Sequence, residues 1–360
     1  MTEMQELSDN FHSVLKVTEE AQTTSLSSCL ADSPDHWDHN AEGDGAQSQW
    51  REFHNFMNKQ AETHLYPKYL YRAHVHGHPH PRMLDDCKKF YSDNFGSDLH
   101  LWCEYDAESP IWVPIGDPMD LTVEDFFCDL NLHLDKTVIN HRAKCDGEQP
   151  FLSSLVSLSG NFCWTAQRIC QVGRKTSEDQ IPGLAIFKTA MINPTGVRIY
   201  RVKDMLKFFD RRLVESSVHI SSRLRDWARN ADEYVCWSLV PREALVAFTP
   251  LPDLIESFNG GEEAFLTKGF VDSNYLRDFR ERPLVHVSLR EYADRASRFV
   301  RNIITDVSNL EEAKQLCMHM EEVLSNPSTW GYEVAYSAQD LDAAISSSVK
   351  KALETAFGLS

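Results

Sequence analysis

The pattern of hydrophobic and polar positions predicts short strands in the middle of the chain and helices towards its end. Apolar, aromatic and β-branched residues between turn signals predict strands at residues 69–75, 151–155, 184–190, 197–202, 233–240 and 244–248. Apolar residues at helical spacing predict helices at 121–135, from Ser157 or Ser159 onward, and at 212–227, 290–306, 310–324 and 338–356. Because these strands and helices do not alternate as regular βαβ units, the sequence predicts an α+β fold.

The first part of the chain lacks such a pattern. Its first 50 residues hold ten acidic side chains against one lysine, Lys16, and several polar runs. Such a segment buries too little apolar surface to offset the entropy lost on ordering. We therefore expect residues 1–60 to be an acidic, mostly disordered arm, residues 61–285 an α+β domain, and residues 286–360 a helical C-terminal region.

Composition and charge exclude several classes of protein. The chain has 360 residues, 42% of them hydrophobic and 25% charged, as is typical of globular proteins. Its net charge of −18 argues against nucleic acid and against an anionic membrane surface as partners. No apolar run reaches the roughly 18 residues of a bilayer span, and Met1–Asn10 lacks the features of a signal peptide.

The cysteines indicate the compartment. There are nine, an odd number, and none forms a CxxC pair. Reduced thiols are the simplest interpretation, so we expect an intracellular protein, cytoplasmic or nuclear.

Three segments of the predicted β-rich region combine apolar residues with residues suited to chemistry. They are Leu70-Tyr71-Arg72, Pro150-Phe151-Leu152-Ser153-Ser154 and Asp232-Glu233-Tyr234-Val235. In order and residue type they resemble the Arg–Ser–Glu pattern of the ADP-ribosyltransferase fold, and are most similar to an uncharacterised fungal family of unknown function. The resemblance covers about residues 66–250. It implies a split-sheet ADP-ribosyltransferase-like domain, followed by the helical region.

The resemblance also implies roles for these residues. Arg72 would hold a phosphate or the nicotinamide ribose of NAD, since a guanidinium matches phosphate and stays charged. Ser153 would bind the ribose or brace the site, with Ser154 beside it. Glu233 would be the catalytic carboxylate that stabilises an oxocarbenium-like ribose. NAD is then a substrate, and no metal is expected.

One position departs from the family's pattern. Arginine-modifying members carry Glu or Gln two residues before the catalytic Glu, where this chain has Ala231. The expected activity is therefore mono-ADP-ribosyl transfer to an unknown protein or small-molecule acceptor, or NAD glycohydrolysis. The alternative is an inactive scaffold that acts as a protein-interaction module, in which Arg72 is a sheet-edge residue and Glu233 a solvated turn residue.

Two further patterns contain residues that could form a site. His74, His76, His78 and His80 alternate after Arg72, but Gly77, Pro79 and Pro81 break the strand pattern, which favours a histidine-rich loop at the rim of the site over a metal centre. Cys163-Trp164 with His286 downstream resembles papain-like thiol hydrolases. That interpretation lacks an upstream Gln, has Ser328 where Asn is needed, and requires Cys163 to be exposed beside a histidine.

Overall fold

A computed structural model describes residues 44–63, 66–76, 90–91, 103–106, 111–114, 122–146, 155–176, 181–192, 199–213, 220, 222–237, 239–240, 242–255 and 264–359. The chain divides into two units, Met1–Tyr66 and Pro67–Ser360. In the first unit, residues Asp44–Thr63 form the helix α3. The segment predicted as a disordered arm, residues 1–60, therefore contains a helix from Asp44 onward, and residues 1–43 lie outside the described part.

The sequence of α3 contains a helical pattern of apolar residues, although it follows a strongly acidic segment. Trp50, Phe53 and Met57 follow one another at helical spacing, three and four residues apart. The rings of Trp50 and Phe53 meet edge to face, with 5.5 Å between their centroids. An amphipathic helix thus follows the most acidic part of the chain.

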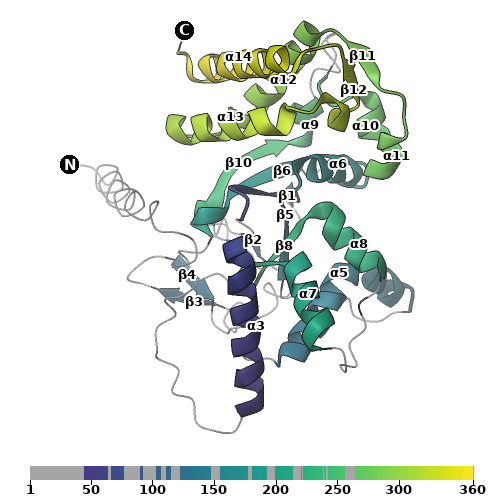
Figure 1. The fold of residues 1–360 in the computed structure, drawn as a ribbon, viewed down its shortest axis with the longest axis vertical. Helices are drawn as coiled ribbons and strands as arrows, with labels where there is room; N and C mark the ends of the chain where they lie inside the picture. Colours follow the sequence, from purple (N-terminus) through teal and green to yellow (C-terminus); the bar gives the residue numbers. More distant parts are fainter. Residues whose placement is uncertain are drawn as a thin grey trace, which may run out of the picture. The chain divides into compact units, whose positions relative to one another are not determined.

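A six-stranded antiparallel sheet organises the second unit (Figure 1). Its order is β10-β6-β1-β5-β8-β7, and each adjacent pair is antiparallel. The strands are β1 (Tyr69–His76), β5 (Leu155–Ser159), β6 (Ile181–Lys188), β7 (Ile199–Arg201), β8 (Glu233–Trp237) and β10 (Leu245–Pro250). The predicted α+β class and most of the predicted strands are confirmed.

The sequence misplaced two helix boundaries. Ser157 and Ser159 belong to β5, and the helix behind them, α6, spans Phe162–Gly173 and is capped by Asn161, whose side chain accepts from Trp164 N. The predicted helix 212–227 is confirmed only in its second half, where α8 spans Ser222–Ala231, while α7 (Val202–Arg212) ends where the prediction begins. In the first case the apolar pattern continues through the boundary, while the Asn161 cap sets the start of the helix.

Shorter elements complete the described part. The pairs β2 (Phe90–Tyr91) with β9 (Leu239–Val240) and β3 (Cys103–Asp106) with β4 (Ile111–Pro114) are antiparallel. The pair β11 (Val285–Val287) with β12 (Tyr332–Val334) is parallel. Short helices α9 (Leu251–Ile255), α10 (Lys268–Asp272) and α11 (Leu276–Arg280) and 3-10 segments at Thr189–Met191, Arg242–Ala244 and Pro327–Trp330 connect them.

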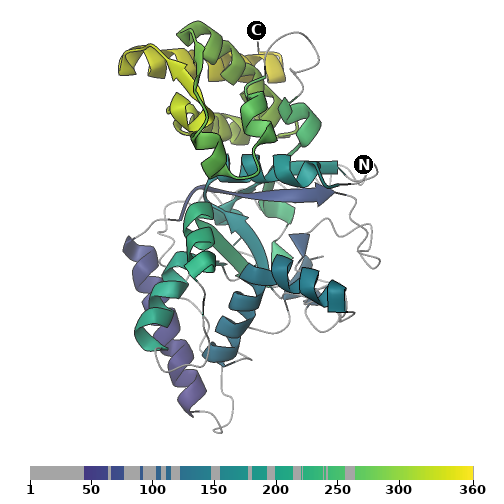
Figure 2. The same ribbon diagram turned by 90° about the vertical axis from the view of Figure 1, so that its right-hand side faces the viewer.

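Helices cover the sheet in two groups (Figures 1 and 2). The helix α6 packs on β1 and β6, and beyond it lie α12 (Leu289–Ile304), α13 (Leu310–Leu324) and α14 (Ala338–Phe357). The helices α7 and α8 contact β8 at the other end of the sheet, and α5 (Val123–Asp146) contacts α8. The three predicted C-terminal helices are thus observed within one or two residues of their expected bounds.

The hydrophobic core joins the C-terminal helices to the sheet. One cluster of buried residues includes Tyr71 of β1, Phe162 of α6, Phe299 of α12 and Ile345 of α14. Trp330, 1% exposed, packs its ring on Phe162 and on the aromatic residues Phe265, Phe270 and Phe299. The core therefore crosses the predicted domain boundary at residue 285, and the helical region docks on the sheet domain.

We expect Trp330→Ala to lower the free energy of unfolding by about 3–5 kcal/mol, because it removes a large buried ring and leaves a cavity. Chemical denaturation monitored by circular dichroism measures this change. Met318→Ala, at a side chain that is 65% exposed, is the control and should change stability by less than about 0.5 kcal/mol. A loss of 1 kcal/mol or less in Trp330→Ala would show that the C-terminal layer is loosely packed.

Hydrogen bonds also connect β1 to the C-terminal helix α13. The Tyr71 hydroxyl is hydrogen-bonded to Nε2 of His319 on α13, and Nδ1 of His319 lies 3.6 Å from Glu322 Oε2. Next to it, Tyr69 donates to Glu312 Oε1 at 2.9 Å, and Lys188 pairs with Glu312 Oε2 at 2.6 Å. Burial lowers the pKa of His319 below its usual value, and nearby Lys68 acts in the same direction while Glu322 opposes them.

This pKa shift predicts a pH dependence of stability. A lowered pKa means that the folded protein disfavours protonated His319, so its contribution is present above about pH 6.5, the ordinary pKa, and is lost as the pH falls further. His319→Gln should therefore lose less stability than wild type between pH 7.5 and 5.5, measured by urea midpoints. His286→Gln, on an exposed histidine, should behave like wild type. Equal losses in wild type and His319→Gln would contradict the assignment.

Candidate functional site

The sheet brings two of the predicted site residues onto strands separated by a single neighbour. Arg72 lies in β1 and Glu233 is the first residue of β8, and β5 runs between these strands. In the register, Ser159 of β5 is opposite both Tyr71 and Glu233. The order of the sheet therefore gathers segments that lie about 160 residues apart in the sequence.

Ser157 of β5 connects Arg72 to Glu233. Nη1 of Arg72 donates to the main-chain oxygen of Ser157 at 2.7 Å. The hydroxyl of the same serine donates to Oε1 of Glu233, also at 2.7 Å. One residue of the central strand thus contacts the candidate cation through its backbone and the candidate carboxylate through its side chain.

The serine in this position differs from the ones chosen in the sequence. Ser153 and Ser154 lie outside the described residues, and Ser157 was predicted to start a helix. The alternation of Leu155-Val156-Ser157-Leu158-Ser159 fits a strand with two hydroxyls on one face. That period of two was the signal that could have identified Ser157.

A histidine that the sequence analysis did not single out completes the cluster. His133 of α5 is 2% exposed, and its Nε2 lies 2.7 Å from Ser157 Oγ. The helix starts at a capping interaction in which Thr122 Oγ1 accepts from Asp125 N. His133 then follows the buried residues Phe126 and Leu130 at helical spacing, which turns it inward.

Burial shapes the electrostatics of this cluster, which we call the Arg72–Ser157–Glu233–His133 cluster. Glu233 is only 3% exposed, so it is not the solvated turn residue of the alternative interpretation. A buried carboxylate is costly unless it is hydrogen-bonded or near a positive charge. The hydrogen bond from Ser157 is the contact that offsets this cost for Oε1 of Glu233.

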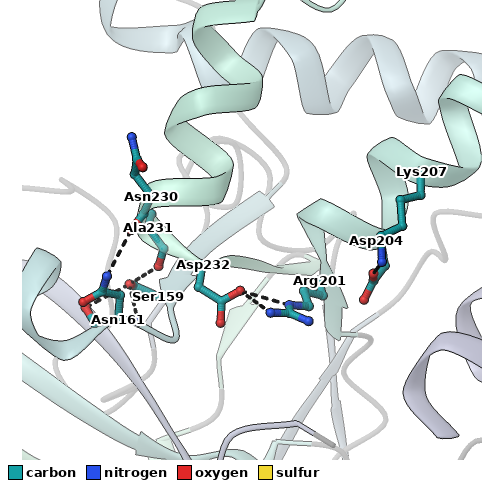
Figure 3. A network of polar contacts seen from close by, with 8 residues as sticks. All are labelled: Ser159, Asn161, Arg201, Asp204, Lys207, Asn230, Ala231 and Asp232. Atoms are coloured by element: carbon teal, nitrogen blue, oxygen red, sulfur yellow. Dashed lines mark hydrogen bonds and ion pairs between the residues drawn. The ribbon is translucent and has the colours of Figure 1, made fainter. Parts of the chain in front are cut away.

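The residue before Glu233 has an unusual backbone. Asp232 has φ +44°, the only positive φ outside glycine among the described residues. Oδ1 of Asp232 accepts from Arg201 Nε at 3.0 Å and from Nη2 at 2.6 Å (Figure 3). An aspartate tolerates this left-handed conformation better than most side chains, and the Arg201 fork holds its side chain in place.

Main-chain contacts fix the same turn from the other side. Gly160 N donates to Asp232 O at 2.9 Å, and a Cβ on Gly160 would lie 2.5 Å from Asp232 Oδ2. Ser159 Oγ donates to Ala231 O, and Asn161 Nδ2 donates to Asn230 O (Figure 3). The turn after β5 and the turn before β8 are thus hydrogen-bonded to each other. These bonds fix the position of Glu233, the first residue of β8.

We expect Asp232→Ala to lower the free energy of unfolding by about 1–3 kcal/mol, because it loses the Arg201 pair and places alanine at a positive φ. Asp232→Asn, which tolerates this backbone, should cost less. The comparison by thermal and urea denaturation separates backbone strain from the ion pair. Asp226→Ala, which removes an exposed pair with Arg229, is the control, and equal effects of all three changes would contradict this account.

The remaining sequence candidates do not join the cluster. Cys163 is 5% exposed, its thiol donates to Thr329 O at 3.6 Å, and burial raises its pKa to about 12. The exposed Cys163 that a papain-like thiol hydrolase requires is therefore absent. His286 pairs instead with Glu333 on the small parallel sheet.

The alternating histidines are only partly described. His74 lies in β1, with its ring edge to face with Phe248 at 6.1 Å, while His78 and His80 fall outside the described residues. Within the described ranges, no group of three or more His, Cys, Asp or Glu side chains is placed to hold a metal ion.

Comparison with models of known protein families, with curated proteins and with solved structures found no match. In the described part of the chain, no helix combines the length and the apolar character needed to cross a bilayer. The candidate site therefore rests on the geometry and chemistry of its own residues.

Proposed function

We propose that this protein binds NAD and transfers its ADP-ribosyl group to an acceptor or to water, with an ADP-ribosyltransferase-like site formed by Arg72, Ser157 and Glu233. The observation that supports it most is the hydroxyl of Ser157, which donates to Glu233 while its carbonyl accepts from Arg72. The three residues come from the neighbouring strands β1, β5 and β8 of one sheet, which supports the proposal. Ser157 takes the role that the resemblance alone assigned to Ser153 and Ser154.

Each residue has a distinct chemical role in this proposal. The guanidinium of Arg72 is a permanent cation with several N–H donors, suited to a pyrophosphate or a ribose hydroxyl. The carboxylate of Glu233 stabilises the positive charge that develops on the ribose as the bond to nicotinamide breaks. Nicotinamide leaves with the bonding electrons, and an acceptor nucleophile then bonds to the ribose carbon and gives up its proton.

The acceptor of the ADP-ribosyl group is less defined than its donor, NAD. The position two residues before Glu233 is Ala231, which is 1% exposed and whose carbonyl accepts from Ser159. A buried alanine offers no group to bind the guanidinium of an arginine acceptor. Water or a non-arginine acceptor therefore fits the site better, and NAD glycohydrolysis is the simplest activity to measure.

One observation favours a second candidate, an inactive scaffold that serves as a protein-interaction module. Glu233 is 3% exposed and accepts a hydrogen bond from Ser157, which also contacts His133. A purely structural role, in which these contacts join β5, β8 and α5, explains the same observations. In that case NAD does not bind, and the cluster stabilises the sheet alone.

Paired substitutions separate the two candidates. Glu233→Gln keeps the shape but removes the charge, so it should bind NAD while its nicotinamide release falls about 100-fold or more. Arg72→Ala should weaken NAD binding by about 2–4 kcal/mol, because it removes a charge-assisted contact. Calorimetric titration of NAD and a nicotinamide-release assay on the same samples measure both effects.

Two exposed residues serve as matched controls. Arg225→Ala removes a surface ion pair with Asp210, and Glu333→Gln alters the exposed partner of His286. Neither should change NAD binding or nicotinamide release. No detectable NAD binding to the wild-type protein would reject the enzymatic proposal and leave the scaffold.

A further inference from the structure

We infer that His133 is a positioning residue of the Arg72–Ser157–Glu233–His133 cluster, which directs the single Ser157 proton to Glu233 by donating its own Nε2–H to Ser157 Oγ. The inference rests on the proposed function for its catalytic consequence, but its hydrogen-bond direction can be tested without NAD. It concerns a residue from a helix, α5, that lies outside the three strands of the Arg–Ser–Glu pattern.

The direction follows from counting protons. A serine hydroxyl has one proton to donate and two lone pairs with which to accept, whereas an ionised carboxylate can only accept. Ser157 Oγ lies 2.7 Å from Glu233 Oε1 and 2.7 Å from His133 Nε2. If the serine proton points to the carboxylate, the lone pair that faces the imidazole requires a hydrogen on Nε2.

The opposite direction has a different consequence for Glu233. With a bare Nε2, the Ser157 proton would point to His133, and Oε1 of Glu233 would face the oxygen of Ser157. Two oxygen atoms at 2.7 Å without a proton between them repel, so Glu233 would then have to be protonated. The tautomer of His133 therefore decides whether Glu233 is held as the carboxylate that the proposed chemistry needs.

The hydroxyl of Ser157 donates to Glu233 Oε1, and such a bond stabilises the carboxylate form of the side chain. His133 and Glu233 are 2% and 3% exposed, so the carboxylate depends on protein groups for its stabilisation. Arg72 supplies a positive charge from β1 at the carbonyl of Ser157. Cys236 on β8 stays a neutral thiol because burial raises its pKa, so it adds no competing negative charge.

The fixed hydroxyl also has a geometric effect. A side chain that is held by a partner on each side keeps one rotamer, and a misplacement of about 1 Å at a reacting group can cost roughly 100-fold in rate. His133 thus acts on the reaction through Ser157 and Glu233. Its loss should lower kcat for nicotinamide release and leave the KM for NAD unchanged, since Arg72 still binds the dinucleotide.

The first experiment is heteronuclear NMR on the full-length protein with 15N-labelled histidine. We expect His133, assigned by its loss in His133→Gln, to show a protected Nε2–H whose signal shifts in Ser157→Ala. A His133 with its proton on Nδ1 and a bare Nε2 would overturn the inference. His286→Gln, an exposed histidine, controls the assignment.

The second experiment measures steady-state nicotinamide release. His133→Leu should lower kcat about 10- to 100-fold at unchanged KM, whereas His133→Gln, whose amide can donate from a similar position, should keep most of the rate. His286→Leu should match wild type. An unchanged kcat in a folded His133→Leu would overturn the positioning role.

The two experiments separate failure of the inference from failure of the proposed function. A wild-type protein that releases no nicotinamide rejects the proposed function, and the NMR result still decides the direction of the hydrogen bond. An active wild type with a bare Nε2 on His133 rejects the inference and leaves the proposed function standing.

Discussion

The cost of burying the carboxylate of Glu233 is the constraint on which the central part of the sheet depends. A carboxylate at 3% exposure needs a donor and a nearby positive charge. Ser157 supplies the donor, and Arg72 brings its charge to the same serine. Because β1, β5 and β8 are neighbours in the sheet, both contacts join adjacent strands, and the polar cluster follows the order of the strands.

The turn before Glu233 shows how firmly that arrangement is held. Asp232 has a left-handed backbone, and its side chain accepts hydrogen bonds from Arg201. It also lies so close to Gly160 that a Cβ at position 160 would collide with the Asp232 carboxylate. Strained backbone next to a polar cluster is typical of positions where the direction of a side chain matters. Here the strain lies one residue before the carboxylate, so it acts on where β8 begins.

Much of the fold could be predicted from the sequence, because its strands and C-terminal helices have strong local periodicity. The placement of Arg72 and Glu233 on strands could be predicted as well, since apolar residues surround each of them in the sequence. Ser157 was missed, although the alternation in Leu155–Ser159 is the signal of a strand, because a segment of five residues is short beside the helical pattern that follows it. His133 contacts Ser157 across 24 residues of sequence, and a contact between a helix and a strand has no local signal.

Successive side chains of a strand point to opposite faces, and β1 gives this rule a particular consequence. Tyr71 joins the aromatic core and His319 of α13, while the next residue, Arg72, reaches Ser157. One peptide unit therefore separates the anchor of the C-terminal helices from the candidate site. Substitutions around α13 are therefore expected to co-vary with those at the cluster in related sequences.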